Sequence, residues 1–387
     1  MMLLEHDAKR LLADAGLPVP SGRLVRSTDI AGLASVPPAL PLPLVVKAQV
    51  PVGGRGKAGG IRMVRDADAL AHTLHAVGGL EIRGHKVRAC RLEQAVDFTG
   101  EAYLSFTLDA GPGNVRLLMS ARGGMDVEDP SMRPHLLSAA VPADPDSLMA
   151  GIDTLAPHLP DAARAPLMAA ARALVPLFFR LEALLVEINP LFIRADGSWV
   201  AGDAKLAVDE NAFVRQPELA AIVRDNPDLY PEAALKLEQG YDYVLLDPDG
   251  DIGLVTTGAG LSMQLVDELV ARGRRPFNFC DIRTGQFRGD PARLIEVLER
   301  IAAGPSIRAV LINFFAGHTD LGEIARLLVI ALKAVPHLKA PVTARMIGNG
   351  LDRARAIIRE AGEPVRIETD LERAIALAIN AAETAHA

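Results

Sequence analysis

The chain has 387 residues, half of them hydrophobic, so it is long and apolar enough for two or three separate cores. Its mildly acidic balance, a net charge of −7, argues against a nucleic-acid-binding protein. Cys90 and Cys280 give neither a disulfide framework nor metal-ligand spacing, which favours a reducing, cytoplasmic location. No uninterrupted apolar run reaches the ~18 residues that cross a bilayer, so no membrane partner is expected.

The first half of the chain alternates predicted helices and strands. Apolar residues at helical spacing predict an amphipathic helix over residues 3–15, in place of a signal peptide. The next predicted elements are the strands "LPLVVKAQV" and "GIRMVR", the helix "ADALAHTLHAVG" and the strand "KVRACRLEQAV". An antiparallel pair turning at "GPGN", a long helix over 161–182 and a hairpin turning at "ADGS" complete this half.

The pattern changes after a segment rich in Pro, Asp and Glu at 215–243. Five strand–helix repeats follow, from "DIGLVTT" to "TDLERAIALAINAAE". Repeats of this length predict a parallel, doubly wound sheet, in which ligands bind at the carboxyl ends of the strands.

Between the first two predicted strands lies the glycine-rich, basic segment "VPVGGRGKAGG". Glycine lets backbone N–H groups approach a ligand closely, and lysine and arginine donate charge-assisted hydrogen bonds to phosphate oxygens. The segment could be a phosphate-binding ribbon. A basic hairpin tip in water is the alternative, and the pattern alone does not separate the two.

The hairpin around "ADGS" places Asn189 nearly opposite Asp203. Alternate residues share a face of a strand, so Glu187 joins Asn189 and Lys205 joins Asp203. Two neighbouring oxygen ligands suit Mg²⁺, and a polar cross-strand pair on a solvated face is an equal alternative. Glu93 and Glu101 flank "QAVDFTG" and could face a ribose and a metal-bound phosphate, although taken alone they would be surface acids.

The motifs "VVKAQVPVGGRGKAGG", "VEINPL", "GDAKLAVDENA" and "TTGAGLSM" together resemble the β subunit family of succinyl-CoA synthetase, over almost the whole chain. The resemblance implies an α/β fold with an ATP-grasp nucleotide-binding domain over 1–235 and a flavodoxin-like CoA-ligase domain over 240–387. It implies Mg²⁺, ATP (GTP being possible) and an α subunit that holds most of the CoA and carries a phosphorylated histidine, in an αβ or α₂β₂ assembly. Pro20 favours ATP, because ATP-using relatives often have proline there.

The resemblance also implies roles for individual residues. Asn189 and Asp203 match the Mg²⁺ ligands, and Glu187 matches a glutamate that meets the phosphohistidine loop. The nucleotide-contacting positions are Lys47, Gly54, Arg55, Gly56, Glu93, Val96 and Glu101.

The chain departs from the family pattern in its second half, where a small carboxylic acid would bind. Thr257 replaces an asparagine, and "DIRTGQF" with Arg283, Thr284 and Gln286 replaces a glycine-rich run. Gly317, His318 and Thr319 stand at the family's Gly-Gly-Ile sequence. Large polar side chains need partners when they are buried, so we expect an acid with extra polar groups in place of plain succinate. Alternatively, these side chains turn outward and leave a succinate site intact.

His318 lies between a predicted strand and a predicted helix, where helix N–H groups can bind an anion. We expect it to contact substrate or phosphate. A phosphoryl-acceptor role and a capping role are the alternatives.

The sequence thus predicts the β subunit of an ADP-forming acid–CoA ligase that couples ATP cleavage to acyl-CoA formation through an acyl phosphate. The substrate would be succinate, or malate, citrate or another acid. An ATP-grasp ligase for another nucleophile and a non-catalytic ATP-grasp binding protein are the rivals.

Overall fold

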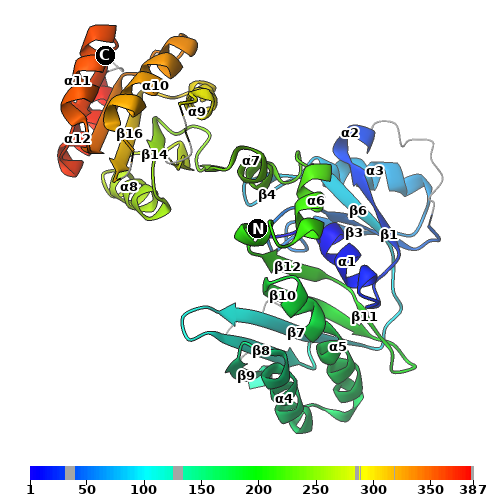
Figure 1. Ribbon diagram of the computed structural model, residues 1–387. Helices are drawn as coiled ribbons and strands as arrows, with labels where there is room; N and C mark the ends of the chain where they lie inside the picture. Colours follow the sequence, from blue (N-terminus) through cyan, green and yellow to red (C-terminus); the bar gives the residue numbers. More distant parts are fainter. Residues whose placement is uncertain (31–39, 125–133, 284–286, 288, 318, 385–387) are drawn as a thin grey trace. The chain divides into compact units, whose positions relative to one another are not determined.

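A computed structural model describes residues 1–30, 40–124, 134–283, 287, 289–317 and 319–384. The chain folds into two compact units, Met1–Leu229 and Tyr230–Ala387 (Figure 1). Each unit is described by itself below. The functional limits predicted above, 1–235 and 240–387, stay a proposal.

The first unit begins with a small antiparallel sheet in the order β1-β6-β2-β3. Its apolar face packs against α2 (Ser27–Ile30) and α3 (Asp68–Gly78), with Leu44, Val46 and Leu92 in the core. The β4–β5 hairpin (Glu81–Ile82, His85–Lys86) follows α3. The strands are β1 (Gly22–Arg26), β2 (Leu44–Ala48), β3 (Ile61–Val64) and β6 (Ala89–Gln94).

The second sheet of this unit is antiparallel in the order β11-β10-β7-β8-β9, and β12 also pairs with β10. Helices α4 (Pro145–Leu155) and α5 (Asp161–Arg180) pack on it, and α1 (Glu5–Asp14) contacts β12. Helix α6 (Pro217–Asp225) comes near the end of the unit. The strands are β7 (Gly100–Asp109), β8 (Asn114–Ser120), β9 (Leu137–Pro142), β10 (Ala183–Ile193), β11 (Trp199–Ala201) and β12 (Ala204–Val208).

Helix α5 has the length and apolar composition of a membrane span, the one such helix in the described part of the chain. Ten of its residues, including Leu174 and Phe178, are buried inside the fold. Core helices of globular proteins meet the same criteria, so this is weak evidence for a membrane span.

The second unit is a six-stranded sheet in the order β13-β15-β14-β16-β17-β18. From β14 onward the strands are parallel, as the strand–helix repeats predict. Their order is 2-1-3-4-5, that of the flavodoxin-like domain which the family resemblance implies. An antiparallel edge strand, β13, was not predicted. The strands are β13 (Asp242–Leu245), β14 (Ile252–Thr256), β15 (Asn278–Asp281), β16 (Ala309–Ala316), β17 (Val342–Gly348) and β18 (Val365–Glu368).

Helices cover both faces of this parallel sheet, which buries it as such sheets require. Helices α8 (Ala259–Ala271) and α12 (Leu371–Thr384) pack on one face. The other face is covered by α9 (Ala292–Ala302), α10 (Leu321–Ala334) and α11 (Leu351–Ala361), while α7 (Pro231–Gln239) contacts β13. The carboxyl ends of β14, β15 and β16 therefore meet at one edge of the sheet.

Candidate functional site

One face of the second sheet in the first unit carries a continuous set of polar side chains, which we call the polar face. Strands β7, β10 and β12 lie side by side, with Glu187 paired to Ser105 on one neighbour and Lys205 on the other. Alternation along each strand brings further side chains to the same face. The members are Glu101, Tyr103, Ser105, Glu187, Asn189, Asp203 and Lys205.

The predicted juxtaposition of Asn189 and Asp203 is present in the hairpin. The pairs Leu191–Ala201 and Ile188–Ala204 bracket it, which sets Asn189 opposite Asp203. The Asn189 Oδ1 accepts a hydrogen bond of 2.8 Å from the Gly124 N–H. Both side chains offer oxygen atoms on one surface.

Glu187 lies on the polar face between two hydrogen-bond donors. The Lys205 Nζ is 2.7 Å from its Oε1, and the Tyr103 hydroxyl is 3.2 Å from its Oε2. The Tyr103 hydroxyl oxygen also lies 2.9 Å from the Ser105 hydroxyl, which can donate to it while Tyr103 donates to Glu187. These contacts fix the orientation of the carboxylate.

Next to the polar face, charged groups are buried against one another between α1, β2, β6 and the hairpin. Lys47 Nζ lies 2.9 Å from Glu5 and 2.6 Å from Glu93. Arg55 donates to Glu5 at 2.7 Å and to both oxygens of Asp203, at 2.7 and 2.6 Å. Arg55 therefore turns inward from the glycine-rich segment, which excludes the solvated-tip interpretation for this residue.

Lys9 completes this buried cluster. It is fully buried on α1 and lies 2.7 Å from both Glu5 and Glu93. Its ammonium also donates to the Gly202 carbonyl at 2.8 Å, and Lys47 donates to the same oxygen at 2.6 Å. The two lysines thus tie the hairpin that carries Asp203 to the first sheet.

The protonation states of the cluster follow from these contacts. Burial alone would raise the pKa of Glu5, but Lys47, Lys9 and Arg55 hold it well below its usual value. For Glu93 burial is likewise outweighed, mainly by Lys47 and Lys9, and its pKa is lowered. Burial and the nearby Glu5 raise the pKa of Asp203 despite the opposing Arg55.

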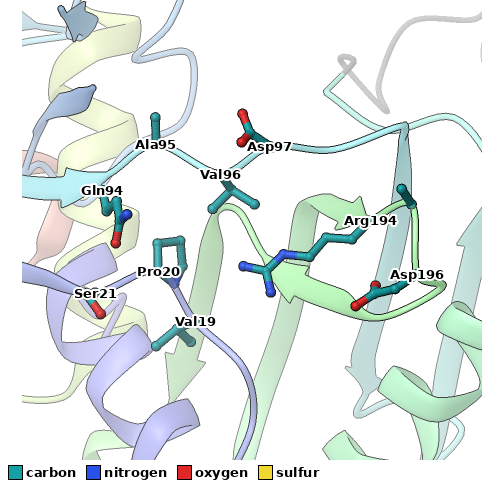
Figure 2. A pocket seen from close by; sticks show the side chains of 10 residues that line it. Val19, Pro20, Ser21, Gln94, Ala95, Val96, Asp97, Arg194 and Asp196 are labelled. Atoms are coloured by element: carbon teal, nitrogen blue, oxygen red, sulfur yellow. The ribbon is translucent and has the colours of Figure 1, made fainter. Parts of the chain in front are cut away.

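An open cavity of about 530 Å³ lies beside this cluster (Figure 2). Pro20 and Val96, which the sequence assigned to the nucleotide, both line it. The Arg194 guanidinium points into it in Figure 2, with Asp97 and Asp196 nearby. Arg91 connects the cavity to the cluster, since it donates to the Pro20 carbonyl at 2.9 Å and to Glu93 at 2.6 Å.

The glycine-rich segment leads from β2 toward the polar face. Gly54 has a φ of +81°, a left-handed conformation that favours glycine. A methyl group on Gly60 would lie 2.8 Å from Ile82 Cδ1 and 3.1 Å from the Arg55 carbonyl oxygen, so a larger residue does not fit there. Gly56 has free space around it, because the nearest atom to a methyl group built there would be Ile61 Cδ1, at 3.9 Å.

At the carboxyl edge of the second unit, two predicted substrate residues already have partners. The Thr257 hydroxyl accepts from the Phe315 N–H at 3.1 Å, which ties β14 to β16. Arg283, with a φ of +53°, donates to Asp242 at 2.7 Å.

The other residues proposed for this edge are less constrained. Gly317 is exposed with no atom within 4 Å of a built Cβ, and Thr319 is half-buried next to the cap of α10. His318, Thr284 and Gln286 lie outside the described residues.

Comparison with known proteins matches both halves. Residues 2–193 match the family model of the ATP-grasp domain, and residues 255–379 match that of the CoA-ligase. The ADP-forming succinate–CoA ligase β subunit of Chloroflexus aurantiacus is 36% identical over 370 residues, covering 93% of this chain and 94% of that protein. The corresponding subunit of Halorubrum lacusprofundi is 33% identical over 396 residues, covering 99% of each.

The chain belongs to the succinate–CoA ligase β subunit family. It is therefore a chain of an ADP-forming acid–CoA ligase, as the sequence motifs predict. Its fold is also that of the ATP citrate lyase of Methanothrix soehngenii, solved with citrate and coenzyme A, with a TM-score of 0.74, 20% identity, and coverage of 98% of this chain and 99% of that one. At this identity the likeness shows the fold alone.

Members of this ligase family use ATP and Mg²⁺, and the donor set on the polar face suits that ion. An amide oxygen and a carboxylate are the hard ligands that Mg²⁺ takes beside phosphate oxygens and water. Asn189 Oδ1 and Asp203 supply them from opposite strands. Because Arg55 already donates to both Asp203 oxygens, a bound ion would share this carboxylate with the guanidinium.

Sequence reasoning about this ligase subunit missed Glu5, Lys9 and Arg91 as parts of the site. Their signal is weak, because the spacing of Glu5 and Lys9 is that of any i,i+4 ion pair on the surface of an amphipathic helix. Only the packing of α1 against the hairpin and β6 shows that the pair is buried.

Proposed function

We propose that this subunit binds Mg²⁺–ATP in its first unit and passes the terminal phosphoryl group to a histidine on a partner α subunit. The observation that carries the proposal is the joining of the glycine-rich segment to the Asn189–Asp203 hairpin through Arg55 and the two lysines. A retired site would have no physical need for this concentration of buried charge.

The proposed nucleotide lies with its base and ribose in the cavity of Pro20 and Val96, close to Glu93. Backbone N–H groups around Gly54 and Gly56 face the phosphates, and the buried cations Lys47 and Arg55 lie close to this site and hold its parts together. Asn189 and Asp203 would hold Mg²⁺, which supplies charge neutralisation at the phosphates when bound. Glu101 borders the same region, since a side chain on Gly124 would clash with its carboxylate.

Glu187 is the residue proposed to meet the accepting imidazole. Its side chain is 12% exposed, lies 2.7 Å from the Lys205 ammonium, and is oriented by Tyr103. A carboxylate in this position holds an imidazole in the tautomer and direction that transfer requires. The α subunit would also hold most of the CoA, in an αβ or α₂β₂ assembly in the cytoplasm.

For the acid, succinate is the first candidate, because the named relatives are succinate–CoA ligases. Malate, citrate or another polar acid is the second. Two contacts argue against a more polar acid. A further substrate carboxylate at Arg283 would have to compete with Asp242, and the Thr257 hydroxyl already accepts a hydrogen bond from Phe315 within the sheet. Gly317, Thr319 and His318 stay proposed contacts of the acid or of the phosphohistidine.

The test is ADP release by the reconstituted complex of this chain and its α subunit, with CoA and a panel of succinate, malate and citrate. The proposal expects ADP and acyl-CoA in equal amounts, and neither from this chain alone. Acyl-CoA formation by the isolated chain would contradict it, as would ADP release that needs an amine in place of CoA.

A further inference from the structure

We propose that Lys205 contacts the terminal phosphoryl group of the bound nucleotide, a role that rests on the function proposed above and adds a residue to it. Lys205 lies on β12, two residues after Asp203 and on the same face of the strand. Residues so spaced are ~7 Å apart along a strand. A phosphate bound to an ion at Asp203 would therefore be within reach of the Lys205 side chain.

The first support is the position of the Lys205 ammonium between the two parts of the phosphate site. It lies 2.7 Å from Glu187 on β10. On its other side, a methyl group built on Gly53 of the glycine-rich segment would be 3.8 Å from Nζ. Lys205 thus extends from the hairpin to the glycine-rich segment.

The second support is availability. The side chains of Lys47 and Arg55 are only 8% exposed, and each is held by two carboxylates. The Lys205 side chain is 41% exposed, and its carboxylate partner among the described residues is Glu187. An incoming phosphate can reach this ammonium without disrupting the buried cluster.

The third support is the order of features along β10. Arg194, at the end of the strand, lines the base cavity, Asn189 lies in the middle, and Glu187 lies beyond it beside Lys205. A nucleotide whose base fills the cavity and whose phosphates reach Asn189 and Asp203 ends at Glu187 and Lys205. The charge of Lys205 then meets the third phosphate and not the first two.

During transfer, the bond from the γ-phosphorus to its bridging oxygen breaks and its electron pair stays on ADP. The lone pair of the accepting imidazole nitrogen forms the new bond to phosphorus. Lys205 keeps its protons and offsets charge on the phosphoryl oxygens, the main task of protein groups in this reaction.

The experiment is calorimetric titration of the full chain with Mg²⁺–ADP and with a Mg²⁺-bound ATP analogue that has nitrogen between its β- and γ-phosphorus atoms. Lys205→Met should weaken the analogue by about tenfold or more and leave ADP unchanged, since one charge-assisted contact is lost. Lys205→Arg should lose less. Exposed Lys86→Met, on β5, is the matched control and should change neither affinity.

Glu187→Gln separates this role from a purely structural one. It breaks the same ion pair but removes negative charge beside the phosphate, so affinity for the analogue should hold or rise. Equal losses of both nucleotides in Lys205→Met, or no loss of either, would overturn the role of Lys205 while leaving the proposed function intact. A wild-type chain that binds neither nucleotide would overturn both. If Lys205→Met does not fold, Lys205→Gln provides the same comparison.

Discussion

In the first unit, buried charges face one another across elements that are far apart in sequence: α1, β2, β6 and the hairpin all contribute to the cluster. In the second unit, two polar side chains at the centre of the parallel sheet bond to the backbone of neighbouring strands. Asn278 exchanges two hydrogen bonds with the backbone of Leu254, at 2.9 and 2.8 Å, and Thr257 bonds to the next strand.

The difference separates two kinds of pre-organisation. A site for a polyphosphate needs fixed positive charge, and charge can be buried only when it is paired and hydrogen-bonded. An edge of a parallel sheet offers backbone groups to a ligand, and its side chains serve mainly to hold the strands. Substitutions in the first unit should therefore destabilise it by leaving buried charges unpaired. Substitutions in the second unit should do so by leaving buried backbone groups without hydrogen-bond partners.

The largest effect is expected at Lys9. Replacing it by Met leaves Glu5 and Glu93 buried with less compensation, which should cost about 3–5 kcal/mol of unfolding free energy. Denaturant titration followed by fluorescence of Trp199, the single tryptophan and a residue of the first unit, measures it. Lys339→Met, at an exposed site in the second unit, is the control. A loss below 1 kcal/mol would show that the cluster does not depend on Lys9.

The next effect is expected in the second unit, at Asn278. Asn278→Ala leaves a buried N–H and C=O of Leu254 without partners, at a cost of about 3 kcal/mol. Scanning calorimetry should show the transition of this unit lowered and that of the first unit unchanged. Asn380→Ala, exposed on α12, should change neither transition. If Asn278→Ala left the unfolding transition of this unit unchanged, the two hydrogen bonds from Asn278 to the Leu254 backbone would not contribute to stability.

Acid should weaken the first unit more than the second. The lowered pKa values of Glu5 and Glu93 give stability that is complete above about pH 4.5 and is lost as the pH falls through the folded-state values. Asp203, with a raised pKa, acts in the opposite direction, and we expect the two glutamates to outweigh this single aspartate. The unfolding free energy should therefore fall as the pH is lowered from about 6 to about 3.

Glu5→Gln is the variant that checks this assignment. It should be less stable at neutral pH and should show a flatter acid limb in the same fluorescence titration. An unchanged slope would remove Glu5 as a source of the pH dependence.

The smallest effect is expected at Arg283. Arg283→Gly relieves the strain of a left-handed backbone at a non-glycine residue, which should stabilise the unit by about 1 kcal/mol. It also removes the half-exposed ion pair with Asp242, which should cost about 1 kcal/mol. Stability should change by less than about 1 kcal/mol. If Arg283 only pairs with Asp242, the preferred acid substrate should be the same in the variant and the wild type. A wild type that prefers another acid and a variant that prefers succinate would support the prediction of altered specificity.

Most of the fold could be predicted because it depends on local patterns. The five strand–helix repeats predicted a parallel, doubly wound sheet, and the "ADGS" turn set the register that brings Asn189 opposite Asp203. Strand β13 was missed because the Pro- and acid-rich segment around it carries no clear alternation.

The candidate site was harder to predict than the fold, since burial of charge depends on packing between distant elements. Glu93, which taken alone read as a surface acid, is 2% exposed between Lys9, Lys47 and Arg91. Arg283 was read as a substrate contact, and only the structure shows the added strand β13 placing Asp242 within its reach.

The most direct test of the account is calorimetric titration of ATP into the full chain, with and without Mg²⁺, for the wild type and Asp203→Ala. If the polar face is the Mg²⁺–ATP site, Mg²⁺ should raise the ATP affinity of the wild type by about tenfold or more and should have little effect in the variant. Equal gains from Mg²⁺ in both proteins would contradict the assignment of Asp203 and of the polar face to this site.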